Sequence, residues 1–286
     1  LERYEVPWAL EFLPDGRLLI SEMAGALKLR SADGAIGEIT GLPEISHGGQ
    51  GGFGDVVLHP DFEENNLVYM SYVEPGDGDT RGAAVARAEL SLSGNRGEFT
   101  DLEVVWRQVP KVSGQGHYGH RIAFGPDGYL WISSGDRQKF DPSQDLGTNI
   151  GKVVRLNMDG SVPDDNPFNA RGGVAAEIWS MGHRNPLGLA FDESGQLWNI
   201  EMGPRHGDEL NMVERAKNYG YPIVSNGDHY ETQSIPDHPL SSRTAVAIRD
   251  HGLEISDHGL NPEFDRPAAY WVPAISPSSL MFYSGS

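Results

Sequence analysis

The stretch FLPDGRLLISE, residues 12–22, places a Pro-Asp-Gly turn between two apolar runs. Asp-Gly supplies the positive backbone φ angles that a tight turn requires, so this stretch predicts a β-hairpin. The arrangement returns as LHPDFEENNLVYMSY at 58–72, FGPDGYLWISSGD at 124–136 and FDESGQLWNIE at 191–201. Because one hairpin pattern repeats along the chain, the sequence predicts a repeated β-architecture.

Further strands are predicted after these hairpins, at residues 26–30, 83–90 and 152–157. Spacings of roughly 45 to 65 residues between the repeats are typical of four-stranded propeller blades that carry insertions. No segment keeps a 3.6-residue apolar period, so we expect helices to be few and short. The sequence therefore predicts an all-β protein of the β-propeller class.

The last third of the chain changes character. Residues 228–267 are polar and rich in His, Asp, Ser and Pro, and we interpret them as a long excursion from the ring. Residues 268–271 and 279–283 are predicted to open another blade. We expect one incomplete propeller domain over residues 1–286, with four readable repeats and the start of a fifth. Since a propeller closes its ring to protect strand edges, the C-terminal part of the ring is expected to be missing.

Composition excludes several classes of function. The 286 residues include 22 basic and 41 acidic side chains, a net charge of -19, so nucleic acid is not an expected partner. No apolar run approaches the roughly 20 residues of a membrane span, and we expect no membrane insertion. Cysteine is absent, which excludes disulfides, thiolate metal sites and cysteine nucleophiles.

Four polar clusters flanked by glycine lie outside the apolar strands, and propeller loops are where function gathers. The first is HGGQGG at residues 47–52. Its glycines let the backbone approach a flat ligand, and the Gln50 amide can donate or accept a hydrogen bond. A flexible turn explains the same residues equally well.

The second cluster, GQGHYGHR, holds His117 and His120. Either imidazole can act as a general base, because histidine titrates near a pKa of about 6.5, and a purely hydrogen-bonding role is the alternative. The third cluster, WSMGHRNP, places Arg184 beside Asn185. A guanidinium fork beside an amide suits an oxygen-rich ligand.

The fourth cluster, EMGPRHGDE, is followed nine residues later by NYGYP. Exposed carbonyl groups at Gly203 and Pro204, with carboxylates close by, suit Ca²⁺, which prefers oxygen ligands. For Asp208 and Glu209 the alternative is a pair of solvated surface carboxylates.

Together the ordered motifs GQGG, GHxxxR, HRNPxG, MGPRxGDE and NYGYP resemble the glucose/sorbosone dehydrogenase family, and more closely its soluble aldose sugar dehydrogenases. The resemblance covers nearly the whole chain, from Val6-Pro7-Trp8 to Pro277-Ser278. It implies a six-bladed propeller that binds PQQ and Ca²⁺ at the mouth of its central channel. It also implies PQQ- and calcium-dependent oxidation of aldose sugars at the anomeric carbon to lactones.

The resemblance further implies a role for individual residues. His117 matches the base that removes the proton of the anomeric hydroxyl, while hydride passes from that carbon to the quinone. Gln50 matches a residue near the substrate. The implied cofactor contacts are Arg184 and Asn185. The implied metal ligands are the carbonyls of Gly203 and Pro204 for the Ca²⁺ that also binds PQQ, and Glu209 with the Tyr219 carbonyl for a second, structural Ca²⁺.

Two features depart from the family pattern. The family holds the PQQ carboxylates with basic residues in its last blade, and this sequence ends before such a segment. His120 and Met202 stand where relatives often carry glycine and a different polar residue. The resemblance also implies a periplasmic or secreted bacterial protein that passes electrons to an acceptor which the sequence does not name.

Two other readings use the same residues. A metal-dependent lactone hydrolase on a propeller would gather polar side chains around one cation, with Asp136, Asn149 and Asp208 as candidates. A non-catalytic propeller would bind a protein or a glycan, because this fold hosts many unrelated functions.

Overall fold

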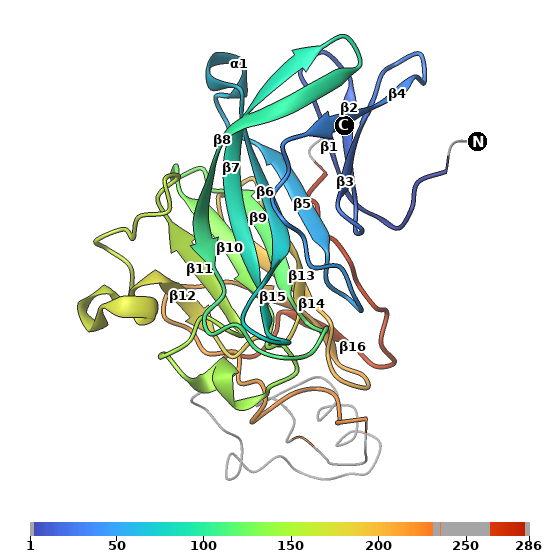
Figure 1. Ribbon diagram of the computed structural model, residues 1–286. Coiled ribbons are helices and arrows are strands. Elements are labelled where there is room, and N and C mark those ends of the chain that lie inside the picture. Colours follow the sequence, from blue (N-terminus) through green and yellow to red (C-terminus); the bar gives the residue numbers. More distant parts are fainter. Residues whose placement is uncertain (1–2, 231–234, 236–263, 284–286) are drawn as a thin grey trace, which may run out of the picture. The chain divides into compact units, whose positions relative to one another are not determined.

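The computed structural model describes residues 3–230, 235 and 264–283, and over these residues the fold is all-β (Figure 1). Sixteen strands form the regular structure of the described chain. Its helical segments are short: α1 (Phe62–Asn65), η1 (Asp141–Gln144), η2 (Asn169–Arg171) and η3 (Gly173–Glu177). The predicted all-β class and the scarcity of helix are confirmed.

The chain divides into two compact units, Leu1–Ile132 with Leu156–Ser161 and Ser133–Arg155 with Val162–Ser286. The first unit contains an eight-stranded sheet of order β1-β2-β3-β4-β8-β7-β6-β5. Two antiparallel meanders, β1–β4 and β5–β8, meet in this sheet at the parallel pair β4–β8. The strands are β1 (Pro7–Phe12), β2 (Leu18–Glu22), β3 (Ala26–Arg30), β4 (Ile36–Thr40), β5 (Phe53–Leu58), β6 (Leu67–Pro75), β7 (Arg81–Ser93) and β8 (Arg96–Arg107).

The Pro-Asp-Gly stretch folds as the hairpin that its sequence predicts. β1 and β2 pair antiparallel up to Phe12 opposite Leu18. The turn between them closes with a hydrogen bond of 2.8 Å from the Leu13 amide to the Arg17 carbonyl oxygen. Gly16 has φ +84, a left-handed value that glycine adopts without steric cost. The local turn chemistry thus fixes the register of the first hairpin.

Strand periodicity builds the core of the first unit. In β3, Leu27 and Leu29 are buried, whereas Lys28 lies between them on the other face and pairs with Glu38. In β6, every residue from Val68 to Val73 is buried, as expected for an inner strand covered on both faces. The core cluster joins side chains from both meanders, including Leu19, Phe53 and Met70.

A four-stranded sheet has the order β12-β11-β10-β9, with β9 (Gly119–Phe124), β10 (Leu130–Ser134), β11 (Lys152–Leu156) and β12 (Ile178–Met181). β9 and β10 flank the predicted hairpin at 124–136. β11 matches the strand predicted at 152–157. Within the second unit, β11 pairs antiparallel with β12, and Lys152 lies opposite Met181.

The remaining sheet belongs to the second unit and has the order β13-β14-β15-β16. Its strands are β13 (Pro186–Phe191), β14 (Leu197–Glu201), β15 (Asp208–Met212) and β16 (Ala269–Trp271). β16 pairs antiparallel with β15, with Tyr270 opposite Glu209. The fourth strand of this sheet, β16, therefore begins more than fifty residues after the end of β15.

This pairing corrects the prediction that residues 268–271 open a fifth blade, because β16 completes the sheet of β13. Residues 279–283, also predicted as a strand, contain no strand in the structure. Most of the predicted excursion at 228–267 lies outside the described residues. Six blades, a single domain and a missing C-terminal portion stay predictions.

Candidate active site

In the first unit, the HGGQGG loop packs against the GQGHYGH loop. The Gln50 amide donates a hydrogen bond of 2.8 Å to the Gln115 carbonyl oxygen. Gly49 has φ +60, and a Cβ at this position would lie 2.6 Å from both the Cβ and the carbonyl oxygen of Gln115. Glycine is therefore required at residue 49 by backbone conformation and by space. The two loops that the sequence singled out separately form one structural element.

Gln50 also positions His117. The side-chain Oε1 of Gln50 accepts a hydrogen bond of 2.9 Å from the His117 amide. His117 is 6% exposed and has φ +48, a left-handed conformation that is uncommon for a residue with a side chain. Since left-handed residues of this kind persist only where their surroundings hold them, the Gln50 contact helps to fix the backbone at His117.

His120, the other base candidate, lies in a buried stack. Its ring is parallel to Trp8 with centroids 5.0 Å apart, and its Nδ1 lies 2.8 Å from the Ser71 hydroxyl. The Arg121 guanidinium covers the same indole at 3.9 Å and forms an ion pair of 3.2 Å with Asp55. His120 uses its ring face and its Nδ1 in these contacts and thereby supports the GQGHYGH loop.

Two carboxyl groups in the same unit, those of Asp55 and Glu11, have pKa values above their usual range. Burial raises the pKa of Asp55 above its usual range, although Arg121 and the Ile122 amide act in the opposite direction. Burial, and then the charge of Asp55, raise the pKa of Glu11 to about 7. Near Asp55 the first unit therefore contains a carboxyl group, that of Glu11, whose pKa lies near neutrality.

In the second unit, Arg184 reaches back to the Met-Gly-Pro segment. Its Nη1 donates hydrogen bonds to the carbonyl oxygens of Met202, at 2.9 Å, and of Gly203, at 2.5 Å. Its guanidinium also lies 5.9 Å from the ring centre of Tyr221. Arg184 Nε and Asn185 Oδ1 have no hydrogen-bond partner within the described chain. Both predicted cofactor residues thus retain unused hydrogen-bonding capacity.

A buried network that no sequence motif indicated orients Arg184. The Glu201 carboxylate accepts a hydrogen bond of 2.7 Å from the Arg184 amide, and its other oxygen lies 3.3 Å from His183 Nδ1. The Nε2 of His183 lies 2.8 Å from the Ser180 hydroxyl. Ser180 and His183 are fully buried, so this chain of groups supports the loop instead of meeting a substrate. In the sequence, this network is indicated by Glu201, a charged residue at the end of the apolar strand LWNIE.

The predicted metal ligands lie close together in sequence but differ in their surroundings. A Cβ on Gly203 would meet the carbonyl oxygens of Gly207 and His206 at 2.2 and 2.3 Å, so oxygen atoms crowd this glycine. Glu209 is 6% exposed, and Asn226 donates to it at 3.4 Å. Burial raises the pKa of Tyr219, whose hydroxyl donates to the Met212 carbonyl.

Asp208 is occupied by backbone amides. One carboxylate oxygen accepts from the Gly203 amide at 3.0 Å, and the other accepts from the Ile275 and Ser276 amides at 2.7 Å each. Across the part of the chain that the structure describes, no group of three or more His, Asp or Glu side chains forms a metal-binding cluster. Asp208, one of the candidate ligands of the lactone-hydrolase reading, is thus engaged by three backbone amides.

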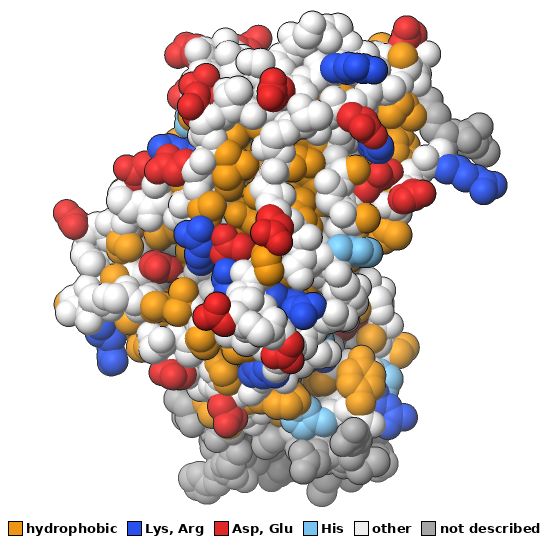
Figure 2. All heavy atoms as spheres, in the orientation of Figure 1, with side chains coloured by type: hydrophobic (Ala, Val, Ile, Leu, Met, Phe, Trp, Pro, Cys, Tyr) orange, Lys and Arg blue, Asp and Glu red, His pale blue; other side chains and the backbone are white. Residues whose placement is uncertain are grey.

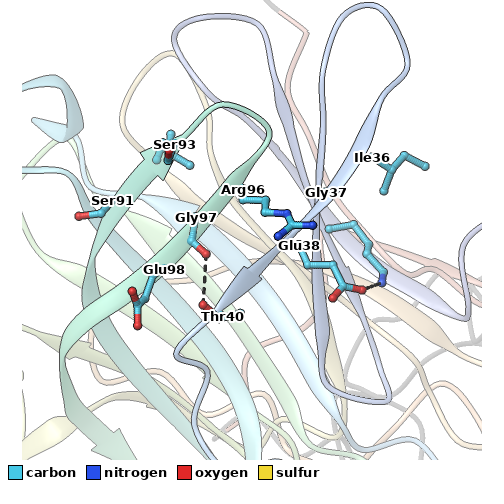
Figure 3. Close-up of a pocket in the computed structure, with 11 residues that line it drawn as sticks. Ile36, Gly37, Glu38, Thr40, Ser91, Ser93, Arg96, Gly97 and Glu98 are labelled. Carbon is cyan, nitrogen blue, oxygen red and sulfur yellow. Dashed lines mark hydrogen bonds and ion pairs between the residues drawn. The ribbon is translucent and has the colours of Figure 1, made fainter.

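A groove of about 760 Å³ lies elsewhere in the first unit, where β4 meets the β7–β8 hairpin (Figure 3). Lys28 and Glu38 form an ion pair on one wall, and Thr40 donates to the Gly97 carbonyl at 3.3 Å. Arg96 and Glu98 add one charge of each sign. No predicted site residue lines this groove, and its balanced charges favour no particular ligand.

The surface agrees with the acidic composition, since acidic side chains are spread over the face in Figure 2 with basic ones between them. Over the described residues, no helix has the length and apolarity to cross a membrane. The structure thus groups Gln50 with His117 in one unit and Arg184 with Gly203 in the other. That these residues form one site at the mouth of a central channel stays a prediction.

A model of the Glucose / Sorbosone dehydrogenase family matches residues 4–286. The chain belongs to this family. It is 38% identical over 286 residues to aldose sugar dehydrogenase YliI of Escherichia coli, an alignment that covers 99% of this chain and 72% of that protein. The resemblance drawn from the five motifs is therefore confirmed.

Two further family relatives carry cofactor information in their names. Quinoprotein glucose dehydrogenase B of Acinetobacter calcoaceticus is 32% identical over 253 residues, which cover 79% of this chain and 52% of that one. The PQQ-bound aldose sugar dehydrogenase of Streptomyces coelicolor has a similar fold, with a TM-score of 0.72 and 28% identity, over 94% of this chain and 69% of that one. Relatives in this family are thus oxidoreductases, as the sequence predicted.

Proposed function

We propose that this chain oxidises aldose sugars at the anomeric carbon, with PQQ as cofactor and Ca²⁺ as its metal. The observation that carries the proposal is the family match over residues 4–286, within which the GQGG, GHxxxR and HRNP motifs are intact. By the same resemblance, we place the enzyme in the periplasm or outside a bacterial cell, passing its electrons to a separate acceptor.

The loop that carries the HRNP motif, residues 182–186 (the HRNP loop), fits PQQ, an anion that presents carbonyl and carboxylate oxygens. Arg184 would hold it through guanidinium N–H groups, since Nε has no partner in the described chain. Asn185 would add its side-chain amide. When bound, PQQ supplies the two-electron acceptor for the hydride that leaves the anomeric carbon.

The surroundings of Gly203 fit a hard cation, because the carbonyl oxygens of His206 and Gly207 lie close beside it. Gly203 and Pro204 would present their carbonyl oxygens to Ca²⁺. The Gly203 oxygen would then be shared with the Arg184 N–H that already reaches it. Glu209 and the Tyr219 carbonyl are proposed to hold a second, structural Ca²⁺.

On the substrate side, His117 is proposed to accept the proton of the anomeric hydroxyl oxygen. A neutral imidazole nitrogen is required for this step, so the ring must be deprotonated before the sugar reacts. Gln50 supports the step by holding the His117 amide, and we expect it to lie near the sugar.

Dye-linked oxidation of glucose and other aldoses by purified protein tests the proposal, with PQQ and Ca²⁺ added or left out. Turnover that requires both additions and is lost in His117→Ala is the expected result. A protein that neither binds PQQ nor oxidises any aldose would overturn the proposal, and lactones would then be tested as substrates.

A further inference from the structure

Lys152, the first residue of β11, is fully buried without forming an ion pair in the described chain. Its ammonium group instead donates to three backbone carbonyl oxygens, those of Pro142 at 2.6 Å, Ser143 at 3.0 Å and Ile150 at 2.7 Å. A buried charge is costly unless hydrogen bonds satisfy it. A cage of carbonyl oxygens around a cation is the arrangement that usually holds a metal ion, and here a side chain occupies it.

The segment that this cage clamps is strained. Arg137, Gln138 and Phe140 all have positive φ angles, between +55 and +64, and none is glycine. Phe140 combines φ +64 with ψ -87, outside the left-handed region that side chains tolerate. Conformations of this kind persist only where their surroundings over-determine them. η1 follows directly, and Lys152 binds its carbonyl groups.

The clamped turn is in direct contact with the HRNP loop. Ser143 donates its hydroxyl proton to the His183 carbonyl at 3.0 Å, and its own carbonyl accepts from the Gly182 amide at 3.0 Å. The His183 amide donates to the Gly151 carbonyl at 3.2 Å, and the Asp136 amide donates to the Arg184 carbonyl at 2.7 Å. The backbone of residues 182–184 is thus bonded to the segment that Lys152 clamps, residues 136–151.

We propose that Lys152 is a positioning residue, whose ammonium group acts as a built-in cation that holds the 136–151 segment and thereby orients Arg184 toward the cofactor. The role of Arg184 toward the cofactor rests on the proposed function, whereas the positioning of the loop by Lys152 is independent of it. Lys152 itself does not touch the ligand. Its effect passes through Ser143 and Gly151 to the backbone at His183.

The test compares Lys152→Met with the wild type at pH 6, where the lysine is charged. We expect the dissociation constant for PQQ, titrated without sugar, to rise about tenfold. Hydrogen exchange at residues 182–184 should accelerate, while β13–β15 keep their protection. The matched control is Lys217→Met, which removes a 42% exposed lysine that pairs with Asp265, and it should leave both readouts unchanged.

Chemical rescue separates positioning from general destabilisation. The chain has no cysteine, so Lys152→Cys creates a single thiol that 2-bromoethylamine converts, in denaturant, into a lysine analogue. After refolding, this product should recover PQQ affinity and slow exchange, whereas alkylation with iodoacetamide should not. Wild type taken through the same refolding cycle is the reference. Should Lys152→Met fail to fold, Ser143→Ala should give a smaller change, about threefold, in the same direction.

Wild-type affinity and wild-type exchange at residues 182–184 in Lys152→Met would overturn the proposal, as would an equal rescue by both reagents. If the wild type itself binds no PQQ, the proposed function fails. The exchange measurement then still decides whether Lys152 positions the HRNP loop.

Discussion

The guanidinium group of Arg184 donates a hydrogen bond to the carbonyl oxygen of Gly203, with the two atoms 2.5 Å apart. The family resemblance implies different ligands for these two residues, PQQ for Arg184 and Ca²⁺ for Gly203. Their direct contact makes the two sites interdependent, because a positive side chain already lies against an oxygen that is proposed to bind a cation.

Arg184→Met should therefore change the two affinities in opposite directions. Without PQQ, we expect Ca²⁺ to bind several-fold more tightly, since the competing positive charge is gone. PQQ should bind at least about tenfold more weakly, because a charge-assisted hydrogen bond to an anion is lost. Calorimetric titration with each ligand separately measures both effects. Weaker binding of both ligands would show that Arg184 supports the Gly203 carbonyl instead of competing for it.

His117→Gln should lower kcat by about 10²- to 10⁴-fold, the usual contribution of a general base. PQQ affinity should stay close to that of the wild type, since the printed bond from residue 117 to the Gln50 side chain uses the main-chain amide, which the substitution keeps. Steady-state kinetics and a PQQ titration of the same preparation test this. A variant that keeps more than a tenth of the wild-type kcat would remove His117 from the chemical step.

Gly49→Ala should destabilise the first unit by more than about 2 kcal/mol, through left-handed strain together with a clash against Gln115. Gly16→Ala is the matched control, because Gly16 also has positive φ but nothing lies within 4 Å of the added Cβ. We expect about 1 kcal/mol there. Urea unfolding of the two variants measures the difference, and equal losses would mean that the loops at 47–52 and 114–121 yield to the added methyl.

Glu11→Gln should stabilise the protein above neutral pH. The pKa of Glu11 is about 7 in the folded protein against 4.5 ordinarily, so between these values the folded state binds more protons than the unfolded state. Stability from this group is present at low pH and is lost as pH rises through 7. Because the side chain is partly exposed, we expect a gain of only about 1 kcal/mol at pH 8 and almost none at pH 4. A gain of equal size at both pH values would contradict the assignment.

Lys152 should leave a pH signature of the opposite sign. Burial lowers its pKa to about 7 from 10.5, against the opposing charge of Asp145. Between these values the unfolded state binds more protons, so this group makes stability increase with pH. The free energy of unfolding, measured at pH 7 and pH 9, should rise more for the wild type than for Lys152→Met, by up to about 2 kcal/mol. Parallel pH curves would place the titration elsewhere.

Local chemistry made much of this fold predictable. The hairpin around Gly16 follows from its turn residues, and β3 follows from the alternation of Leu27, Lys28 and Leu29. β8 was not predicted, because RGEFTDLEVVWR mixes charged and apolar residues, and most of its side chains are exposed although the strand lies between β4 and β7. β16 was assigned to the wrong sheet, since pairing across more than fifty residues depends on tertiary contacts that no local pattern encodes.

The candidate site divides in the same way. Gln50, His117 and Arg184 stood out because their residue types suit a ligand and glycines flank them. Glu201 and Lys152 did not, because each lies at the end of an apolar strand and bonds to groups in other segments of the chain. A polar residue in an apolar strand indicates that its side chain needs hydrogen-bond partners. Only the fold shows which groups those partners are.

The cage around Lys152 has a practical consequence for handling the protein. A metal ion in such a cage exchanges with solvent and can be stripped by a chelator, whereas an ammonium group tethered to β11 cannot leave. Treatment with EDTA should remove any calcium near Gly203 while the turn at residues 141–144 keeps the Lys152 side chain in its cage. The calcium-free protein would then keep the backbone of the HRNP loop in the conformation that binds the ligand. Reconstitution would require only that calcium and cofactor bind again, without refolding of the loop.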